Sequence, residues 1–266
     1  MSWDRQITIK SEHELEIMRT AGRINAEALA AVHKILQPGV TTADLNAAAE
    51  EVMKKYGVYS PFKNYGGPIP FPASTTISIN EELVHGIPGD RQVEEGQIVS
   101  IDVGVFYKGY YGDAARSMAC GTVDRSRQRL LDTTDLALSR AIRAARTGNC
   151  LRDIGVAVEK TCSVEGFGVV RDFVGHGIGT EMHEEPQIAN FDTGERGPRL
   201  KSGMVLAIEP MVNLGTERVK VLKDRWTAVT ADGKPSAHFE HSVVVREDGG
   251  EILSGSDACV WGRREG

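Results

Sequence analysis

The sequence predicts an α+β fold built from two similar halves, each of which runs helix, helix, strand. Three observations predict it. The N-terminal segment up to Gly57 holds two stretches of helical apolar spacing, a Pro- and Gly-rich loop at 65–72 then gives way to strand-like runs, and the same order returns in the second half of the chain. We expect one domain over residues 1–266, with halves at approximately 11–123 and 124–253.

The first half opens with two amphipathic helices. Ser11 and Glu14 form a capping-box pattern, and Pro38 and Gly39 end the first helix. Thr42 is expected to cap the second helix, which stops at Gly57. The apolar positions of the first helix recur at helical spacing: Ile17, Ala21, Ile24, Ala28, Val32 and Ile35.

The two halves also align with each other in sequence. The helical segment 28–57 matches 137–166, with Gly39 falling on Gly148 at the end of one helix. The strand-like segment 96–102 matches 203–209. Because helix, glycine and strand recur in the same order, we interpret the match as an internal duplication.

Strands follow the helices in both halves. Residues 77–80 and 98–103 read as strands. Two similar halves packed about a pseudo-twofold axis would surround a curved, mainly antiparallel sheet and bring equivalent strands to a shared centre. Asp102 and Glu209 then become a candidate pair of buried acids.

The composition limits the classes of partner. The chain has 31 basic and 37 acidic residues and no basic run, so we expect no nucleic-acid site and favour small-molecule or peptide substrates. No apolar stretch approaches the ~18 residues that a membrane span needs, and the N-terminus lacks a signal-peptide pattern. The four cysteines form no C-x-x-C pair. We therefore expect a cytoplasmic protein with no membrane partner.

Four acids and one histidine are the candidate catalytic and metal-binding residues. A hairpin that turns at Lys108 and Gly109 would place Asp113 beside Asp102. The second half adds one histidine and two acids whose side chains are also expected to point into the centre. Four carboxylates in one pocket repel one another unless positive charge lies among them, which favours two divalent cations, with Mn, Fe or Co suiting the oxygen-rich shell as well as Zn. The complete predicted set is Asp102, Asp113, His176, Glu209 and Glu240.

Other catalytic patterns are not supported. Gly175, Gly177 and Gly179 lack the last spaced glycine of a dinucleotide-binding loop. No second histidine follows His183 at the spacing of a zinc-protease helix, and no serine occupies a nucleophile elbow.

Short motifs along nearly the whole chain, from IMRTAGR at 17–23 to GEIL at 250–253, resemble those of one enzyme family. They are NEELVHGIPG at 80–89, SIDVG at 100–104, GD at 112–113, GHGIG at 175–179, HEEP at 183–186, IEPM at 208–211, WT at 226–227 and FEH at 239–241. The sequence resembles the bacterial type I methionine aminopeptidases, members of the pita-bread metallopeptidase family. The five metal ligands of that family fall on the five residues that the charge argument selects.

The resemblance implies a single catalytic domain that removes the N-terminal methionine from nascent or newly made proteins whose second residue is small. Glu209 would move the proton, His183 would hydrogen-bond the scissile carbonyl, and His85 would contact the nitrogen beyond it. Two divalent ions are implied, with Co, Mn, Fe and Zn as candidates, and a monomer is expected. The implied substrate pocket contains Phe71, Trp226, Tyr65 and Phe62, and a monovalent cation is implied near Asn80, Glu82 and Ser236.

Some features depart from the pattern of this family. Pro68, Ile69 and Pro70 look like an insertion beside the pocket, and Thr76 stands where many relatives carry a cysteine. Two alternatives remain: an Xaa-Pro aminopeptidase or prolidase, and a non-catalytic peptide-binding module of the same fold. The sequence leaves open the physiological metal, the effect of these changes on specificity and docking on the ribosome.

Overall fold

A computed structural model describes residues 7–255, and its first half begins with two capped helices. The predicted capping box of Ser11 and Glu14 is present at the start of α1 (Glu12–Ile35). Helix α2 (Thr42–Tyr56) ends at Gly57, whose φ of 64° is the left-handed conformation that glycine adopts without strain. The predicted cap of α2 is wrong by one residue. Thr41 is the N-cap, because its hydroxyl accepts from the Asp44 amide while the Asp44 carboxylate accepts from the Thr41 amide.

A long hairpin follows these helices. Strand β1 (Thr76–Ile79) pairs with β3 (Ile98–Tyr107), which pairs with β4 (Tyr110–Ala119), and both pairings are antiparallel. The turn falls at Lys108 and Gly109 as predicted, and both have positive φ. The structure extends the predicted 98–103 strand to Tyr107, because the hairpin partner continues to supply hydrogen bonds beyond the apolar run. It also moves the predicted 77–80 strand one residue toward the N-terminus.

The second half repeats this plan. The sequence alignment of the two halves places the end of α1 on the end of α3 (Arg125–Ala144), and the start of α2 on the start of α4 (Leu151–Ser163). It also places the start of β3 on the start of β8 (Val205–Ile208), so the predicted repeat is reproduced in the structure. The largest sheet has the order β14-β13-β8-β6-β7. Its other strands are β6 (Gly175–Gly177), β7 (Glu184–Ile188), β13 (His241–Val245) and β14 (Gly250–Ile252).

Hydrogen bonding divides the strands into four sheets rather than one continuous sheet. Two three-stranded sheets, β10-β11-β2 and β12-β9-β5, complete the arrangement. Their strands are β2 (Glu82–Val84), β5 (Gly168–Val169), β9 (Met211–Asn213), β10 (Val219–Val221), β11 (Ala228–Thr230) and β12 (Ser236–His238). Within residues 7–255, neighbouring strands inside each of these sheets run antiparallel, as predicted.

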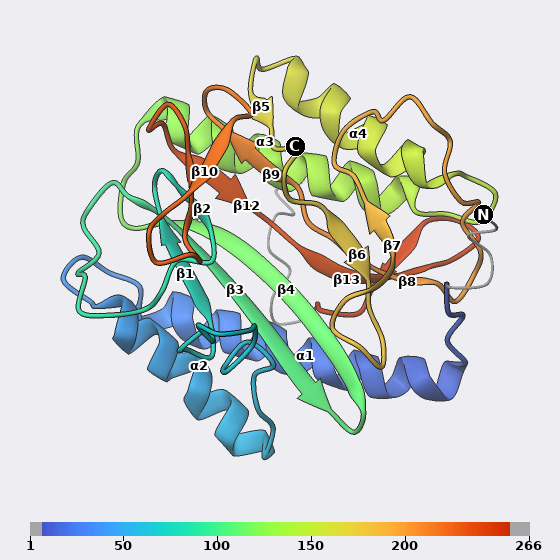
Figure 1. The fold of residues 1–266 in the computed structure, drawn as a ribbon, viewed down its shortest axis with the longest axis horizontal. Helices are drawn as coiled ribbons and strands as arrows, with labels where there is room; N and C mark the ends of the chain where they lie inside the picture. The colour runs from blue at the N-terminus through green and yellow to red at the C-terminus, as the bar shows by residue number, and fades with distance from the viewer. Residues whose placement is uncertain (1–6, 256–266) are drawn as a thin grey trace.

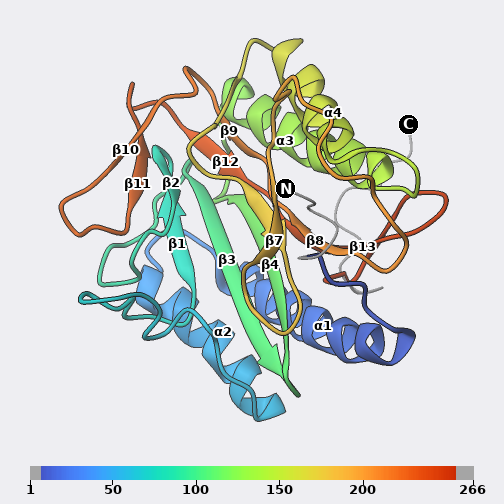
Figure 2. The same ribbon diagram turned by 45° about the vertical axis from the view of Figure 1, so that its right-hand side comes forward.

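The helices pack against the strands as two pairs. In Figures 1 and 2, α1 and α2 lie along one side of the strands and α3 and α4 along the other. One core joins α1 and α2 to β1, β3 and β4, and a second core joins α3 and α4 to β8, β9, β12 and β13. Each pair of helices therefore buries the apolar face of the strands of its own half. No helix in the described part of the chain is long and apolar enough to cross a membrane.

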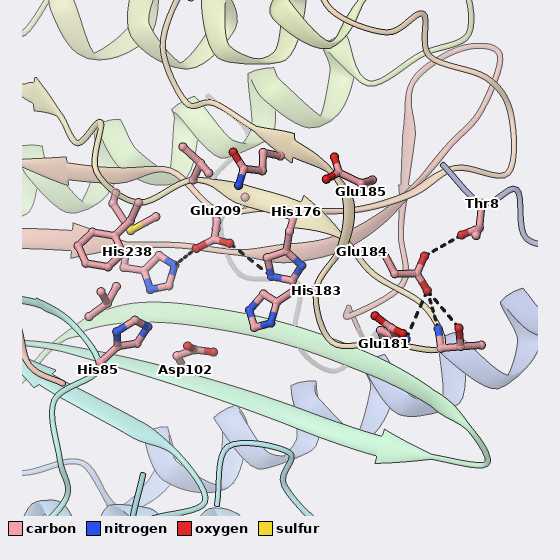
Figure 3. A pocket seen from close by; sticks show the side chains of 17 residues that line it. Thr8, His85, Asp102, His176, Glu181, His183, Glu184, Glu185, Glu209 and His238 are labelled. Carbon is pink, nitrogen blue, oxygen red and sulfur yellow. Dashed lines mark hydrogen bonds and ion pairs between the residues drawn. The ribbon is translucent and has the colours of Figure 1, made fainter. Parts of the chain in front are cut away.

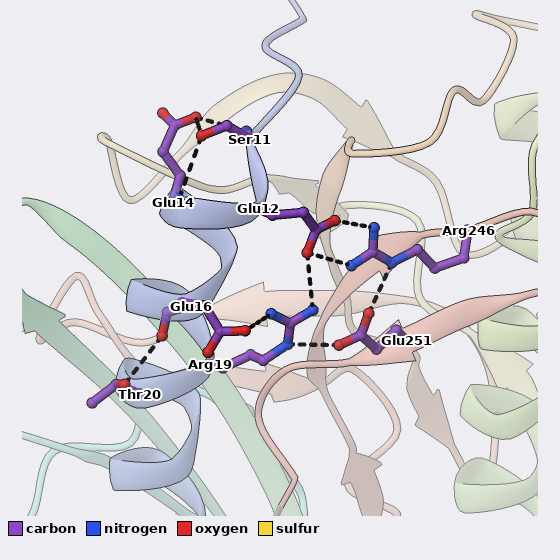
Figure 4. Close-up of polar contacts among 8 residues, drawn as sticks. All are labelled: Ser11, Glu12, Glu14, Glu16, Arg19, Thr20, Arg246 and Glu251. Carbon is purple, nitrogen blue, oxygen red and sulfur yellow. Dashed lines mark hydrogen bonds and ion pairs between the residues drawn. The ribbon is translucent and has the colours of Figure 1, made fainter.

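Direct contacts join the two halves where β4 meets β12 and β13. The Asp113 amide donates to Ser242 Oγ at 2.9 Å, and the Glu240 amide donates to the Ala115 carbonyl at 2.9 Å. A second link, shown in Figure 4, joins α1 to the last strands, where Arg19 Nε lies 2.7 Å from Glu251 Oε1. These contacts hold the acids of both halves on a common centre.

Candidate metal and peptide site

All five predicted ligands line one cavity of about 250 Å³. Asp102 comes from β3, Asp113 from β4, and His176 from β6. Glu209 directly follows β8, and Glu240 lies in the two-residue link between β12 and β13. The cavity therefore collects side chains from both halves of the chain, as the repeat predicts.

The register of the hairpin brings its two acids together. Asp102 lies opposite Ala115, and Asp113 lies opposite Gly104. Asp102 and Asp113 are therefore diagonal neighbours on one face, because residues two apart along a strand point the same way. Both side chains are buried, with exposed fractions of 9% and 4%.

His176 lies beside three of these carboxylates. Its Nε2 is 3.6 Å from Glu209 Oε1 and 3.9 Å from Asp113 Oδ2. Ligand atoms of His176, Asp113 and Glu240 all lie within 4.8 Å of one another. The Nδ1 of His176 is 2.9 Å from the Gly177 carbonyl, and a carbonyl can only accept. Nδ1 therefore carries the proton, and Nε2 presents its lone pair to the cluster, as a metal ligand must.

Burial disfavours the charged forms of all four acids. Burial raises the pKa of Asp102 to about 7 and that of Glu209 to about 8. Burial and the neighbouring carboxylates raise the pKa of Asp113 and of Glu240 well above the usual range. Asp102 Oδ1 and Glu240 Oε1 are buried without a hydrogen-bond partner. Such oxygens fit divalent cations, whose charge would lower these pKa values again.

Two further predicted histidines stand beside the cluster. The His183 ring centroid lies 4.4 Å from that of His176, and the His183 side chain is at the exposed rim. The His85 ring contacts Phe173 and Trp226 edge-on, and its backbone φ is 61°. Burial lowers the pKa of His85 to about 4, so this imidazole is neutral at pH 7. In Figure 3, Glu209 and His176 lie above, His85 and Asp102 lie below and to the left, and the His183 ring lies between these pairs.

His238 also lies at the site, although it was not among the residues predicted from the sequence. It is buried, and its Nε2 lies 3.6 Å from Glu209 Oε2, on the opposite side of that carboxylate from His176 (Figure 3). Ser117 holds the His238 backbone on both sides, since its hydroxyl donates to the His238 carbonyl and accepts from the amide. The available signal was weak, because His238 precedes the predicted ligand Glu240 by two residues but Glu240 lies outside the three-residue strand.

Aromatic side chains form the apolar wall of the same cavity. Trp226 meets Phe71 edge-on, with ring centroids 5.3 Å apart. The predicted pocket residues are thus brought together, and Met182 and Thr76 also line the space. A larger cavity of about 740 Å³ continues from the acids past Phe173 and Gln187 toward solvent. The full apolar lining is Phe62, Tyr65, Phe71, Met182 and Trp226.

The residues predicted near a monovalent cation also lie together. The Ser236 amide donates to the Asn80 carbonyl at 2.8 Å. Glu82 accepts from the Ile79 amide and pairs with Arg91 at 2.7 Å. Arg91 therefore already supplies positive charge to the only acid of this group.

Buried carboxylates and the lone pair of His176 converge beside an apolar pocket open to solvent, which is the arrangement of a metal-dependent hydrolytic enzyme. The sequence profile of metallopeptidase family M24 matches residues 16–247. The chain belongs to metallopeptidase family M24, and membership of this family implies divalent metal binding.

Individual relatives indicate which members of this family the chain is most similar to among those compared. A protein of Clostridium acetobutylicum named methionine aminopeptidase is 47% identical over 249 residues, which is 93% of this chain and 98% of that protein. The crystal structure of methionine aminopeptidase from Thermotoga maritima superposes with a TM-score of 0.91 at 45% identity, covering 94% of this chain and all of that one.

A prolidase has the same fold but a weaker likeness. The structure titled prolidase from Pyrococcus furiosus matches with a TM-score of 0.75 at 26% identity. The match covers 96% of this chain and 67% of the prolidase. The prolidase therefore has a substantial part with no counterpart in the match.

Proposed function

We propose that this chain is a methionyl aminopeptidase, which hydrolyses the first peptide bond of a polypeptide whose N-terminal residue is methionine. The observation that carries the proposal is the apolar pocket directly against the acid cluster. A side chain in that pocket would place its own backbone beside the carboxylates. Methionine is long, unbranched and polarizable, so it suits a pocket walled by aromatic rings.

The proposed ligands for two divalent ions are Asp102, Asp113, His176, Glu209 and Glu240. Bound there, the ions would lower the pKa of a water molecule and polarise the scissile carbonyl. Co, Mn, Fe and Zn are all compatible with four carboxylates and one imidazole. Asn80, Glu82 and Ser236 remain the proposed surroundings of a monovalent ion.

The protein residues would divide the remaining tasks. Glu209 would accept the proton of the attacking water and pass it to the leaving amine, since its carboxylate lines the cavity 3.6 Å from His176 Nε2. His183 would donate a hydrogen bond to the scissile carbonyl oxygen as negative charge develops on it. His85, which lines the same cavity, would contact the nitrogen of the second residue. Phe71, Trp226 and Tyr65 would bind the methionine side chain.

The proposed substrates are N-termini of nascent or newly made polypeptides with a small second residue. The two halves would act as one catalytic domain, since neither half supplies all five ligands. We propose a monomer acting in the cytoplasm, and association with the ribosome is a further proposed partnership.

Cleavage of short peptides tests this function. We expect metal-loaded protein to release methionine from Met-Ala-Ser, chelation to abolish release, and added metal to restore it. An Ala-Pro peptide should remain intact. Cleavage of the prolyl peptide alone would support the prolidase alternative. Cleavage of neither peptide after metal is restored would support a binding module, although all five ligand positions are retained.

A further inference from the structure

A tyrosine and a histidine from distant segments meet at the rim of the apolar pocket. The Tyr65 hydroxyl lies 3.1 Å from His183 Nδ1, and their ring centroids are 5.7 Å apart. Both side chains line the smaller cavity. The two residues are 118 positions apart in the chain, so this contact joins the two halves at the pocket.

The loop that carries Tyr65 is held by its own backbone. The Tyr65 amide donates to the Phe62 carbonyl at 2.9 Å, and the Phe71 amide donates to the Tyr65 carbonyl at 2.8 Å. Trp226 Nε1 donates to the Ile69 carbonyl at 3.1 Å. Tyr65 is therefore fixed at both its amide and its carbonyl, although 47% of its surface is exposed.

The hydrogen bond at Nδ1 decides what His183 can do with its other nitrogen. A neutral imidazole has one N–H and one lone pair, so a donor at Nδ1 forces the proton onto Nε2. A protonated phenol is such a donor. The role of His183 toward a developing oxyanion requires an N–H that does not already serve another acceptor.

We propose that Tyr65 is a positioning residue, which donates to His183 Nδ1 and so fixes the ring and its Nε2–H tautomer for the substrate carbonyl. The inference rests on the proposed function, because it assumes that His183 donates during hydrolysis. Tyr65 thus has two roles: its ring lines the methionine pocket, and its hydroxyl orients the His183 imidazole.

The test compares Tyr65→Phe with Tyr59→Phe and wild type. Tyr65→Phe removes only the hydroxyl and keeps the ring, whereas Tyr59 is an exposed tyrosine outside both cavities. We expect Tyr65→Phe to lower kcat on Met-Ala-Ser by about three- to tenfold, as the loss of one hydrogen bond does, with KM within about twofold. Tyr59→Phe should match wild type.

A second readout examines the tautomer directly. Two-bond ¹H–¹⁵N correlation spectra of Zn-loaded, histidine-labelled protein should show the Nε2–H form at His183 in wild type. A mixture of tautomers is expected in Tyr65→Phe. The His183 signal is assigned by its loss in His183→Gln.

Two results would overturn the inference: an unchanged kcat in Tyr65→Phe, with or without a rise in KM, or the Nδ1–H tautomer in wild type. A rise in KM alone would leave Tyr65 as part of the pocket wall. A wild-type protein that cleaves no Met peptide would instead overturn the proposed function, and the spectra would still decide whether Tyr65 sets the tautomer.

Discussion

The Glu209 carboxylate lies between the imidazoles of His176 and His238. The contact with His238 leads to a specific prediction. His238 Nε2 has no hydrogen-bond partner within 3.5 Å and lies 3.6 Å from the Glu209 carboxylate. Burial lowers the pKa of His238, so its neutral ring orients the carboxylate without adding a charge. We expect His238→Ala to lower metal affinity or kcat by about 10- to 100-fold, as the loss of an outer-shell partner does. Metal titration followed by calorimetry, with kinetics at saturating metal, measures both quantities.

His33→Ala is the control for that prediction, because His33 is a histidine far from this cavity that faces Arg116. It should leave metal affinity unchanged. Equal metal affinity and equal kcat in wild type and His238→Ala would show that Glu209 does not depend on His238.

Replacing Asp113 should have opposite effects on the thermal stability of the metal-free and the metal-loaded protein. Four buried carboxylates repel one another when no cation lies among them, so Asp113→Asn should raise the Tm of the metal-free protein. The same change removes a proposed ligand, so the increase in Tm on adding metal should shrink and turnover should fall about 100-fold or more. Differential scanning calorimetry with and without Mn²⁺ checks both signs. A normal metal-induced increase in Asp113→Asn would contradict its role as a ligand.

The sequence predicted which side chains meet in the cavity better than it predicted the contacts that support them. Asp102 and Asp113 follow from a hairpin, and Glu209 follows from the internal repeat. His238 was missed because one residue in a three-residue strand carries almost no periodic signal. The hydrogen bond from Tyr65 to His183 could not be predicted, since it depends on how a proline- and glycine-rich loop folds back on Trp226.

At the level of elements, the segment before α1 is tied to the loop that carries His183. Lys10 Nζ pairs with Glu184, and the two side chains are 4% and 9% exposed. The Thr8 hydroxyl and the Thr180 amide also donate to the Glu184 carboxylate, each at 2.7 Å. Lys10→Met should destabilise the protein by about 3–5 kcal/mol, because it leaves a buried charge unpaired. Urea unfolding of metal-free protein measures the loss.

Two comparisons test the cause of that loss. Adding Glu184→Gln to Lys10→Met should recover part of the stability, since no uncompensated charge remains. Lys54→Met removes an ion pair whose side chains are 79% and 75% exposed, and it should cost about 1 kcal/mol or less. A small effect of Lys10→Met, similar to that of Lys54→Met, would contradict a buried ion pair.

The stability contributed by the first turn of α1 should depend on pH. Hydrogen bonds from the Ser11 hydroxyl and amide and from the Tyr110 hydroxyl lower the pKa of Glu14 to about 2. The folded pKa lies below the unfolded value of about 4.5, so this contribution is present above pH 4.5 and is lost as the pH falls toward 2. The stability advantage of wild type over Glu14→Gln should therefore shrink across this range. Urea unfolding at several pH values checks it, and a constant or growing difference would contradict the capping role.

The elements themselves were largely predictable, and their ends were not. The capping box of Ser11 and the stop at Gly57 depend on local chemistry, so the sequence predicted them correctly. The cap at Thr41 was missed because Thr41 and Thr42 are both good capping residues. The full length of β3 depends on its pairing with β4, which apolar patterning alone does not determine.

At the scale of the whole molecule, the repeat explains how the site is assembled. Asp102 and Glu209 lie in or just after the equivalent strands β3 and β8, each half supplies one further acid, and the contacts between β4 and β13 bring the acids into one cavity. The division into four short sheets was not predictable, because hydrogen bonding between distant strands decides it. The central claim is that five side chains from both halves hold a pair of cations.

Anomalous diffraction from crystals grown with Mn²⁺ tests that claim most directly. We predict two peaks about 3.5–4 Å apart, contacted by Asp102, Asp113, His176, Glu209 and Glu240. Peaks held by other residues, or a cavity without any peak at saturating Mn²⁺, would contradict the account.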